Sequence, residues 1–164
     1  VAILYHVTKA FKDKGNRVIG IIGAKEHELL ILEEEMQAVC DELVVTTDDG
    51  SYGERGFVTG PLEKYLNERH DIQLVYAIGP IPMMKFVCQL TKRFNMPTMV
   101  SLNPIMIDGT GMCGGCRVKY DNQIQFCCVD GPDFNGHLVD FDELELRNST
   151  YIKEEKDSLL ASIR

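Results

Sequence analysis

The sequence is poor in positive charge and has no long apolar segment. Its 164 residues include 17 lysines and arginines against 25 aspartates and glutamates, a formal net charge of −8 at pH 7. Phosphate backbones would repel so acidic a chain, and we therefore expect no nucleic acid partner. No apolar run approaches the ~20 residues needed to span a bilayer, so we expect no membrane partner. No leader of basic and then apolar residues precedes a cleavage site, which favours a cytoplasmic location.

Internal repeats and low-complexity linkers are also missing. The length fits one domain, or one domain with an appendage, and 45% hydrophobic residues are enough to bury a core. The sequence has no initiating methionine and opens inside a predicted helix. In that helix Leu4, Val7 and Phe11 recur at helical spacing, up to a stop at Gly15-Asn16. We therefore expect it to be part of a longer chain.

Short apolar runs alternate with helical patterns over the first hundred residues. The runs predict buried strands, and the stretches between them predict helices with one apolar face. This alternation, with short connections, is typical of an α/β fold with a doubly wound parallel sheet. The predicted strands cover 18–22, 43–45, 72–78 and 98–100; the predicted helices carry the stripes Leu29-Leu32-Met36-Val39 and Met83-Val87-Leu90-Phe94, and a short helix follows Pro61.

The pattern changes after Asn103. Residues 108–116 contain four glycines, and alternating apolar residues around Asp121-Asn122 predict a small β-hairpin. From Asp140 the chain is charged and predicts a helix. We therefore expect an α/β domain over 1–102, a small subdomain over 103–139 and a charged helical tail over 140–164.

The cysteines are the most informative residues. Four of the six lie between Cys113 and Cys128. Without an export signal they are better explained as metal ligands or buried thiols than as disulfides. Cys113 and Cys116 form a C-x2-C pair, and Cys128 follows after eleven residues. Plant-type [2Fe–2S] proteins use the spacing C-x4-C-x2-C…C, and here Asp108 occupies the first position. Because a carboxylate can also ligate iron, these residues are sufficient for four ligands.

The residues alone do not decide which side chain is the fourth ligand or which metal is bound. Cys127 and Cys128 are neighbours at the end of a predicted strand, where successive side chains point to opposite faces, so one should be a ligand and the other a packing residue. A zinc site on Cys113, Cys116, Cys127 and Cys128 is an alternative, as is a redox-active dithiol at Cys113 and Cys116. Cys40 and Cys88 lie on apolar helix faces and predict inert buried thiols. His137 lies well past the cysteines, where we expect a structural role.

A nucleotide site is indicated more weakly, because the G-x-G-x-x-G fingerprint is missing. Gly79-Pro80, with Met83 one turn later, lies where a predicted strand ends and a helix begins. Ligands of open α/β sheets bind at the carboxyl ends of strands, and a helix N-terminus favours phosphate.

Three runs together resemble a known family: residues 108–118, 126–134 and 136–144. They are similar to the electron-transfer subunits related to that of dihydroorotate dehydrogenase, and within them to the small subunits of NADH-dependent ferredoxin:NADP oxidoreductase. The resemblance implies that the cysteine before Val-Asp-Gly-Pro, Cys128, is the fourth ligand and that Cys127 packs. Asp108 points to the ferredoxin:NADP branch, because the orotate-linked branch has a cysteine there.

The resemblance also implies a ferredoxin reductase-like fold and its cofactors. Gly79, Pro80 and Met83 match the family's C-G-P-x-x-M signature, with Ile78 in place of the cysteine. The run Gly23-Ala24-Lys25 matches a contact of the adenosine ribose or its 2′-phosphate, and Asp49, Gly50 and Ser51 match a loop near the nucleotide. The implied cofactors are a [2Fe–2S] cluster, NAD(P) and FAD. The family's flavin barrel and first, central sheet strand are missing, so we expect poor FAD binding and a foreign strand or oligomer in the gap.

The implied function is an electron-transfer subunit of an NAD(P)H-dependent oxidoreductase. Its expected partners are a larger flavin and iron–sulfur subunit and a ferredoxin, and these 164 residues alone should be inactive. Two alternatives are the electron-transfer subunit of dihydroorotate dehydrogenase, in pyrimidine biosynthesis, and a zinc-stabilised interaction module.

Overall fold

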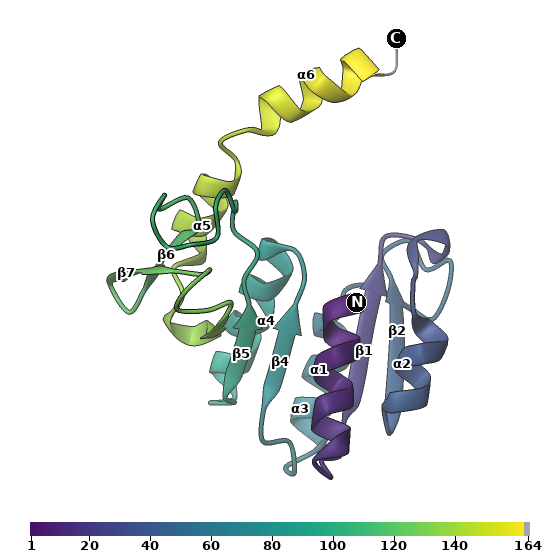
Figure 1. Cartoon of the computed structure of the whole chain (residues 1–164). Helices are drawn as coiled ribbons and strands as arrows, with labels where there is room; N and C mark the ends of the chain where they lie inside the picture. Colours follow the sequence, from purple (N-terminus) through teal and green to yellow (C-terminus); the bar gives the residue numbers. More distant parts are fainter. Residues whose placement is uncertain (163–164) are drawn as a thin grey trace. The chain divides into compact units, whose positions relative to one another are not determined.

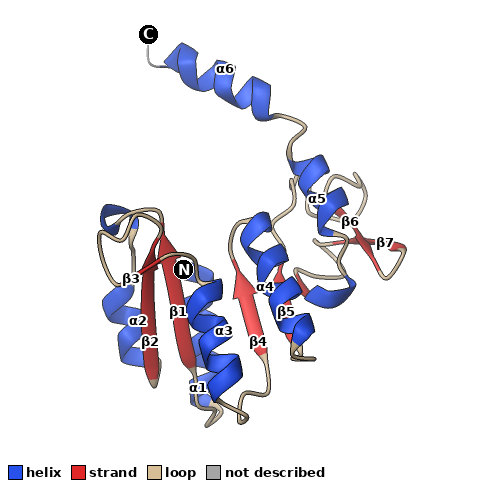
Figure 2. Ribbon diagram, turned by 180° about the vertical axis from the view of Figure 1, so that it is seen from behind, coloured by secondary structure: helices blue, strands red, loops and turns tan. Residues whose placement is uncertain are grey.

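A computed structural model describes residues 1–162 and divides them into two compact units, 1–73 and the chain from Leu74 onward. Figure 1 shows each unit as strands accompanied by helices, and Figure 2 shows them from behind. Both units carry parallel strand pairs, as the α/β prediction requires. Across these described residues, no helix is long and apolar enough to cross a membrane.

The first unit is a three-stranded parallel sheet with helices. Strand β1 pairs with β2 over its whole length, so that Ala24 and Thr47 end their strands side by side. The short β3 continues the sheet beyond β2. The elements are α1 (Ala2–Asp13), β1 (Ile19–Ala24), η1 (His27–Leu29), α2 (Glu33–Val39), β2 (Glu42–Thr47), β3 (Glu54–Arg55) and α3 (Thr59–Glu68).

Helix α1 confirms the predicted opening helix, and Gly15 follows it at φ +80, a conformation that glycine adopts without strain. The prediction of one helix through Leu29, Leu32, Met36 and Val39 is wrong. Leu30 is extended and Leu32 is left-handed (φ 57), so a 3₁₀ turn and a seven-residue helix replace it. Only Met36 of this stripe is fully buried.

The second unit begins with a strand pair and ends in helices. Its sheet has the order β4-β5-β8, with β8 antiparallel at the edge, and β6 and β7 form a separate hairpin. The elements are β4 (Val75–Ile78), α4 (Ile81–Arg93), β5 (Thr98–Ser101), β6 (Arg117–Tyr120), β7 (Gln123–Phe126), β8 (Asp133–Asn135), η2 (Gly136–Leu138), α5 (Phe141–Asn148) and α6 (Ile152–Ser162).

Two details of this unit differ from the sequence predictions. The apolar face of α4 runs through Ile81, Met84, Val87 and Cys88, and Met83 is only partly buried. Strand β8 was not predicted, and it makes the sheet mixed rather than purely parallel. The predicted hairpin is confirmed, and Asp121 (φ 47) and Asn122 (φ 60) both take the left-handed conformation that tight hairpin turns require.

The sheets of the two units are separate. Among the described residues β1 pairs only with β2, and β4 pairs only with β5, so each has one edge without a strand partner. The compact units divide at Gln73–Leu74, inside the predicted first domain. The sequence-based division into 1–102, 103–139 and 140–164 stays a prediction, and the last two residues of its tail, 163 and 164, lie outside the described residues.

Candidate metal centre and nucleotide-binding loops

The predicted metal ligands lie on one long loop and one turn. The loop runs from the end of β5 to the start of β6 and has no helix or strand of its own. Gly109, Gly111 and Gly114 take positive φ values of 74, 83 and 68. A residue with a Cβ adopts a positive φ only at a cost in conformational free energy. The glycines therefore allow the loop to turn repeatedly around its donors.

The structure brings the four predicted ligands together as two pairs. The Sγ atoms of Cys116 and Cys128 lie 3.2 Å apart. In the second pair, Asp108 and Cys113 are near enough for the Cys113 thiol to lower the pKa of the Asp108 carboxyl. The N–H of Thr110, 2.9 Å from Asp108 Oδ1, lowers that pKa most. Within residues 1–162, no group of three His, Cys, Asp or Glu side chains is placed to hold a single metal ion.

Cys127 and Cys128 have different surroundings. Cys127 is 2% exposed, and burial raises the pKa of its thiol to about 12. Cys128 is half-buried, and its hydrogen bond with Cys116 raises the pKa of its thiol. Both residues follow β7 in a turn, so the strand alternation used to separate them does not apply. Their separation comes from the turn, which directs Cys128 towards Cys116.

The donor set fits an iron–sulfur cluster. Thiolates are the usual cluster ligands, and Cys113, Cys116 and Cys128 supply three of them from the loop that carries Asp108 and from the turn after β7. Gly115 donates its N–H to Cys113 Sγ at 3.3 Å, as backbone groups do around cluster sulfurs. Two glycines of the loop leave little room for a larger residue: a Cβ on Gly111 would lie 2.7 Å from Val129 Cγ2, and one on Gly115 would lie 3.0 Å from Ile107 Cδ1.

In the first unit, the predicted nucleotide loops after β1 and β2 lie side by side. The N–H of Asp49 donates to the Lys25 carbonyl at 3.3 Å, and Asp48 donates to Ala24 at 3.1 Å. Asp49 Oδ1 accepts from the N–H of Ser51, which lowers the pKa of the Asp49 carboxyl. Gly50 is left-handed (φ 80). A Cβ on Gly23 would lie 2.7 Å from Thr46 Oγ1, so close packing against Thr46 also explains a glycine at this position.

In the second unit, Gly79 and Pro80 form the turn between β4 and α4. Pro80 is the residue before the helix, and a Cβ on Gly79 would lie 2.3 Å from Met83 Cε. The Met83 side chain therefore folds back over Gly79. This places Gly79, Pro80 and Met83 together at the carboxyl end of β4, where a nucleotide would be expected.

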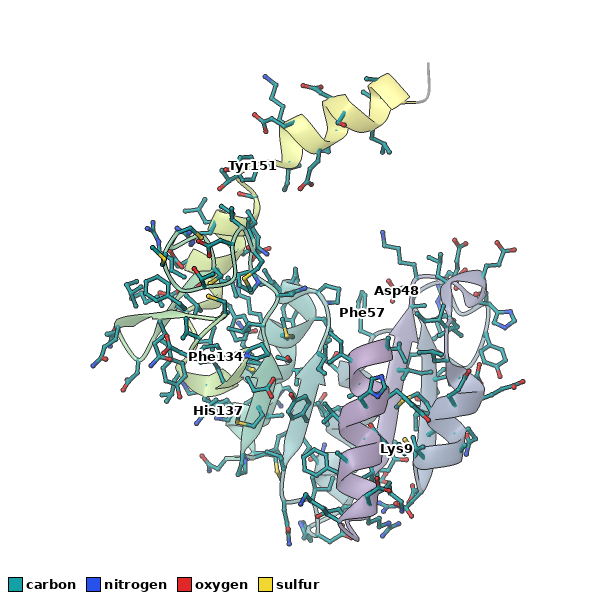
Figure 3. All side chains as sticks on the ribbon, in the orientation of Figure 1. Lys9, Asp48, Phe57, Phe134, His137 and Tyr151 are labelled. Carbon is teal, nitrogen blue, oxygen red and sulfur yellow. The ribbon has the colours of Figure 1, made fainter. Side chains whose placement is uncertain are left out.

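Several interactions near these sites carry no sequence signal. His27 and Tyr52 stack with ring centroids 4.5 Å apart beside the loops of Lys25 and Asp49. Arg147 and Asn148 of α5 bond to the loop that precedes β6. His137, visible in Figure 3, lies 3.0 Å from Thr91 Oγ1 through Nε2, and burial lowers its pKa. The contact with α4 supports the structural role expected for it. Cys88 is buried as predicted, and burial raises the pKa of its thiol to about 12.

Comparisons with known proteins find matches both to one segment of this chain and to nearly all of its length. Residues 103–140 match the iron–sulfur cluster binding domain of dihydroorotate dehydrogenase B. A dihydroorotate dehydrogenase B (NAD(+)) electron transfer subunit homolog from Thermotoga maritima is 47% identical over 158 residues, which are 96% of this chain and 55% of the relative. A probable electron transfer subunit of the same enzyme from Methanocaldococcus jannaschii is 35% identical over 131 residues, covering 80% of this chain and 49% of the relative.

A solved structure extends the match to the whole chain. One chain of the NADH-dependent reduced ferredoxin-NADP oxidoreductase, a structure that gave insights into flavin-based electron bifurcation, superposes with a TM-score of 0.89 at 43% identity. The match covers 98% of this chain and 58% of that one. The chain thus spans about half the length of the relatives it matches. With its cluster-binding segment and its likeness to about half of each of these relatives, the chain belongs to the family of dihydroorotate dehydrogenase B electron transfer subunits and their homologues.

Proposed function

We propose that these residues are the nucleotide- and cluster-binding part of an electron-transfer subunit in an NAD(P)H-dependent flavin and iron–sulfur oxidoreductase. The subunit relays electrons between a nicotinamide, FAD and a larger partner subunit. The relatives are named as electron transfer subunits, which supports the assignment. The additional length of those relatives is the natural place for flavin binding, so the present residues alone should hold FAD poorly.

The pairing of the four donors carries this proposal. A [2Fe–2S] cluster has two irons and four protein ligands, which divide into two pairs. Here Cys116 and Cys128 form one pair, and Asp108 and Cys113 the other. We therefore assign Asp108, Cys113, Cys116 and Cys128 as the ligands, and Cys127 as a packing thiol. When bound, such a cluster accepts and donates single electrons, while the protein holds it and adjusts its potential.

The proposed nucleotide contacts are residues that lie at the carboxyl ends of strands. Gly79, Pro80 and Met83 lie at the carboxyl end of β4, and Lys25 lies beside Asp49 at the ends of β1 and β2. We propose that both groups are nucleotide contacts, the first group in the second unit and the second group in the first unit. Among the described residues, β1 and β4 each have one edge without a strand partner, and we propose that a strand from another segment or chain pairs with such an edge.

The second candidate is the electron-transfer subunit of dihydroorotate dehydrogenase, because several relatives carry that name. The two candidates differ in their partner. Co-purification with a larger flavin and iron–sulfur subunit, alone or with ferredoxin, supports the first. A partner that oxidises dihydroorotate supports the second.

Metal analysis of the anaerobically prepared full chain tests the proposal. We expect about two irons and two inorganic sulfides per chain, as a [2Fe–2S] cluster contains, and an EPR signal after one-electron reduction. Cys128→Ser should lose most of the iron, whereas Cys127→Ala, the matched neighbour, should keep it. A colourless protein with one zinc, or equal iron loss in both variants, would contradict the ligand assignment.

A further inference from the structure

The last turn of α5 is bonded to the cluster-binding loop at both of the loop's ends. Arg147 donates from Nη2 to the carbonyl oxygen of Gly115 at 3.2 Å. Asn148 donates from Nδ2 to the carbonyl of Asn103 at 3.2 Å, and its Oδ1 accepts the N–H of Ile105 at 3.3 Å. Two adjacent residues of one helix therefore fix a long loop that lacks regular structure.

Arg147 is well placed to act on the ligands. Its side chain is only 25% exposed, and Gly115 is the residue directly before Cys116. Glu143, one helical turn earlier, lies 3.8 Å from Arg147 Nε through Oε1, beyond direct hydrogen-bonding distance. Its other oxygen, Oε2, is buried and has no hydrogen-bond partner in the described part of the chain. The guanidinium is thus held loosely by Glu143 and directly by the loop.

We propose that Arg147 and Asn148 are positioning residues for the cluster: Asn148 fixes the start of the loop, and Arg147 fixes its end and places a positive charge beside Cys116. This inference rests on the proposed function, since it requires a cluster on these cysteines. Residues that orient ligands in this way commonly control how firmly a metal group is held.

The charge has a predictable effect on the cluster's reduction. One-electron reduction makes the cluster more negative, and a nearby cation in a partly buried setting stabilises that state. The bond from Arg147 to Gly115 holds this charge next to the ligand loop. The charge therefore raises the midpoint potential, which the net charge around a cluster helps to set.

The test uses the anaerobically prepared full chain and its Arg147→Gln and Asn148→Ala variants. Iron content, the midpoint potential by EPR-monitored titration, and the rate of iron release to a chelator are measured, with circular dichroism to confirm folding. We expect Arg147→Gln to lower the midpoint potential. We expect Asn148→Ala to release iron about tenfold faster, the lower end of the effect of such outer residues.

Arg117→Gln is the matched control. It removes the same charge one residue after Cys116, but the exposed Arg117 side chain has no hydrogen bond or ion pair among the described residues. Its potential should fall less than that of Arg147→Gln. Arg147→Lys, which keeps the charge, should retain most of the potential, and Arg147→Met replaces Arg147→Gln if that variant does not fold.

The outcomes separate two kinds of failure. A parent protein without iron and sulfide overturns the proposed function, and this inference with it. A parent that holds the cluster, with equal potential shifts for Arg117→Gln and Arg147→Gln, or with unchanged iron release in Asn148→Ala, overturns the inference alone.

Discussion

Gly111 offers a quantitative test of how tightly the cluster-binding loop is built. Its φ of 83 is left-handed, and a Cβ there would lie 2.7 Å from Cγ2 of Val129, the residue after the proposed ligand Cys128. The left-handed backbone costs Gly111→Ala about 1 kcal/mol. Turning Val129 away from its rotamer adds about 1 kcal/mol, so we expect a total of about 2 kcal/mol.

Gly109→Ala is the control for the backbone part of this cost. Gly109 is also left-handed (φ 74), but nothing lies within 4 Å of its added Cβ. It should therefore lose only about 1 kcal/mol. The free energy of unfolding is measured by urea denaturation of the metal-free full chain, and iron content by reconstitution. Gly111→Ala should also retain less iron than Gly109→Ala, because the clash displaces the turn that holds Cys128.

A second substitution decides whether contact with Val129 is the cause. Val129→Ala in the Gly111→Ala background removes the Cγ2 atom and should recover about 1 kcal/mol. Equal costs for the two glycine variants, or no recovery in the double variant, would refute the packing described for this loop.

Two further predictions concern Asp108 and His137. Asp108→Cys should keep a cluster, because a thiolate is an accepted ligand, but shift its midpoint potential, and an unchanged potential would argue against Asp108 as a ligand. The pKa of His137 is lowered, first by burial and then by Lys92, so the unfolded state binds its proton more readily than the folded state. The contribution of His137 to the free energy of unfolding is therefore fully present above the unfolded-state pKa of about 6.5, and it is lost as the pH falls below that value. The urea midpoint should drop between pH 8 and pH 5.5, and less so in His137→Gln; parallel pH profiles would contradict this.

Local signals in the sequence predicted much of the fold. Gly15 marks the end of α1, and Asp121-Asn122 marks the hairpin turn, because such positions require particular backbone angles whatever surrounds them. The break between η1 and α2 was missed, since Leu29 and Leu32 belong to a regular helical stripe, whereas the backbone is extended at Leu30 and left-handed at Leu32. Strand β8 was missed because it is three residues long.

The candidate site was likewise predicted from the sequence only in part. The spacing of Cys113, Cys116 and Cys128 predicted a metal site, but spacing alone does not show which donors are neighbours, and the pairing of Cys116 with Cys128 needed coordinates. Arg147 had no signal at all. It lies on a charged helix, where one more arginine looks like any solvated residue, and only its bond to Gly115 marks it out.

The edge strand β8 makes residues 102–132 an excursion that leaves and rejoins the sheet at one place. The chain leaves the sheet after Ser101 and rejoins it at Asp133, and these two residues are register partners. The N–H of Leu102 closes the base by donating to the Pro132 carbonyl at 2.9 Å. Because both ends of the excursion meet at one point, its length and content can change without disturbing β4 and β5. A segment of another length can therefore leave and rejoin the sheet at this same edge.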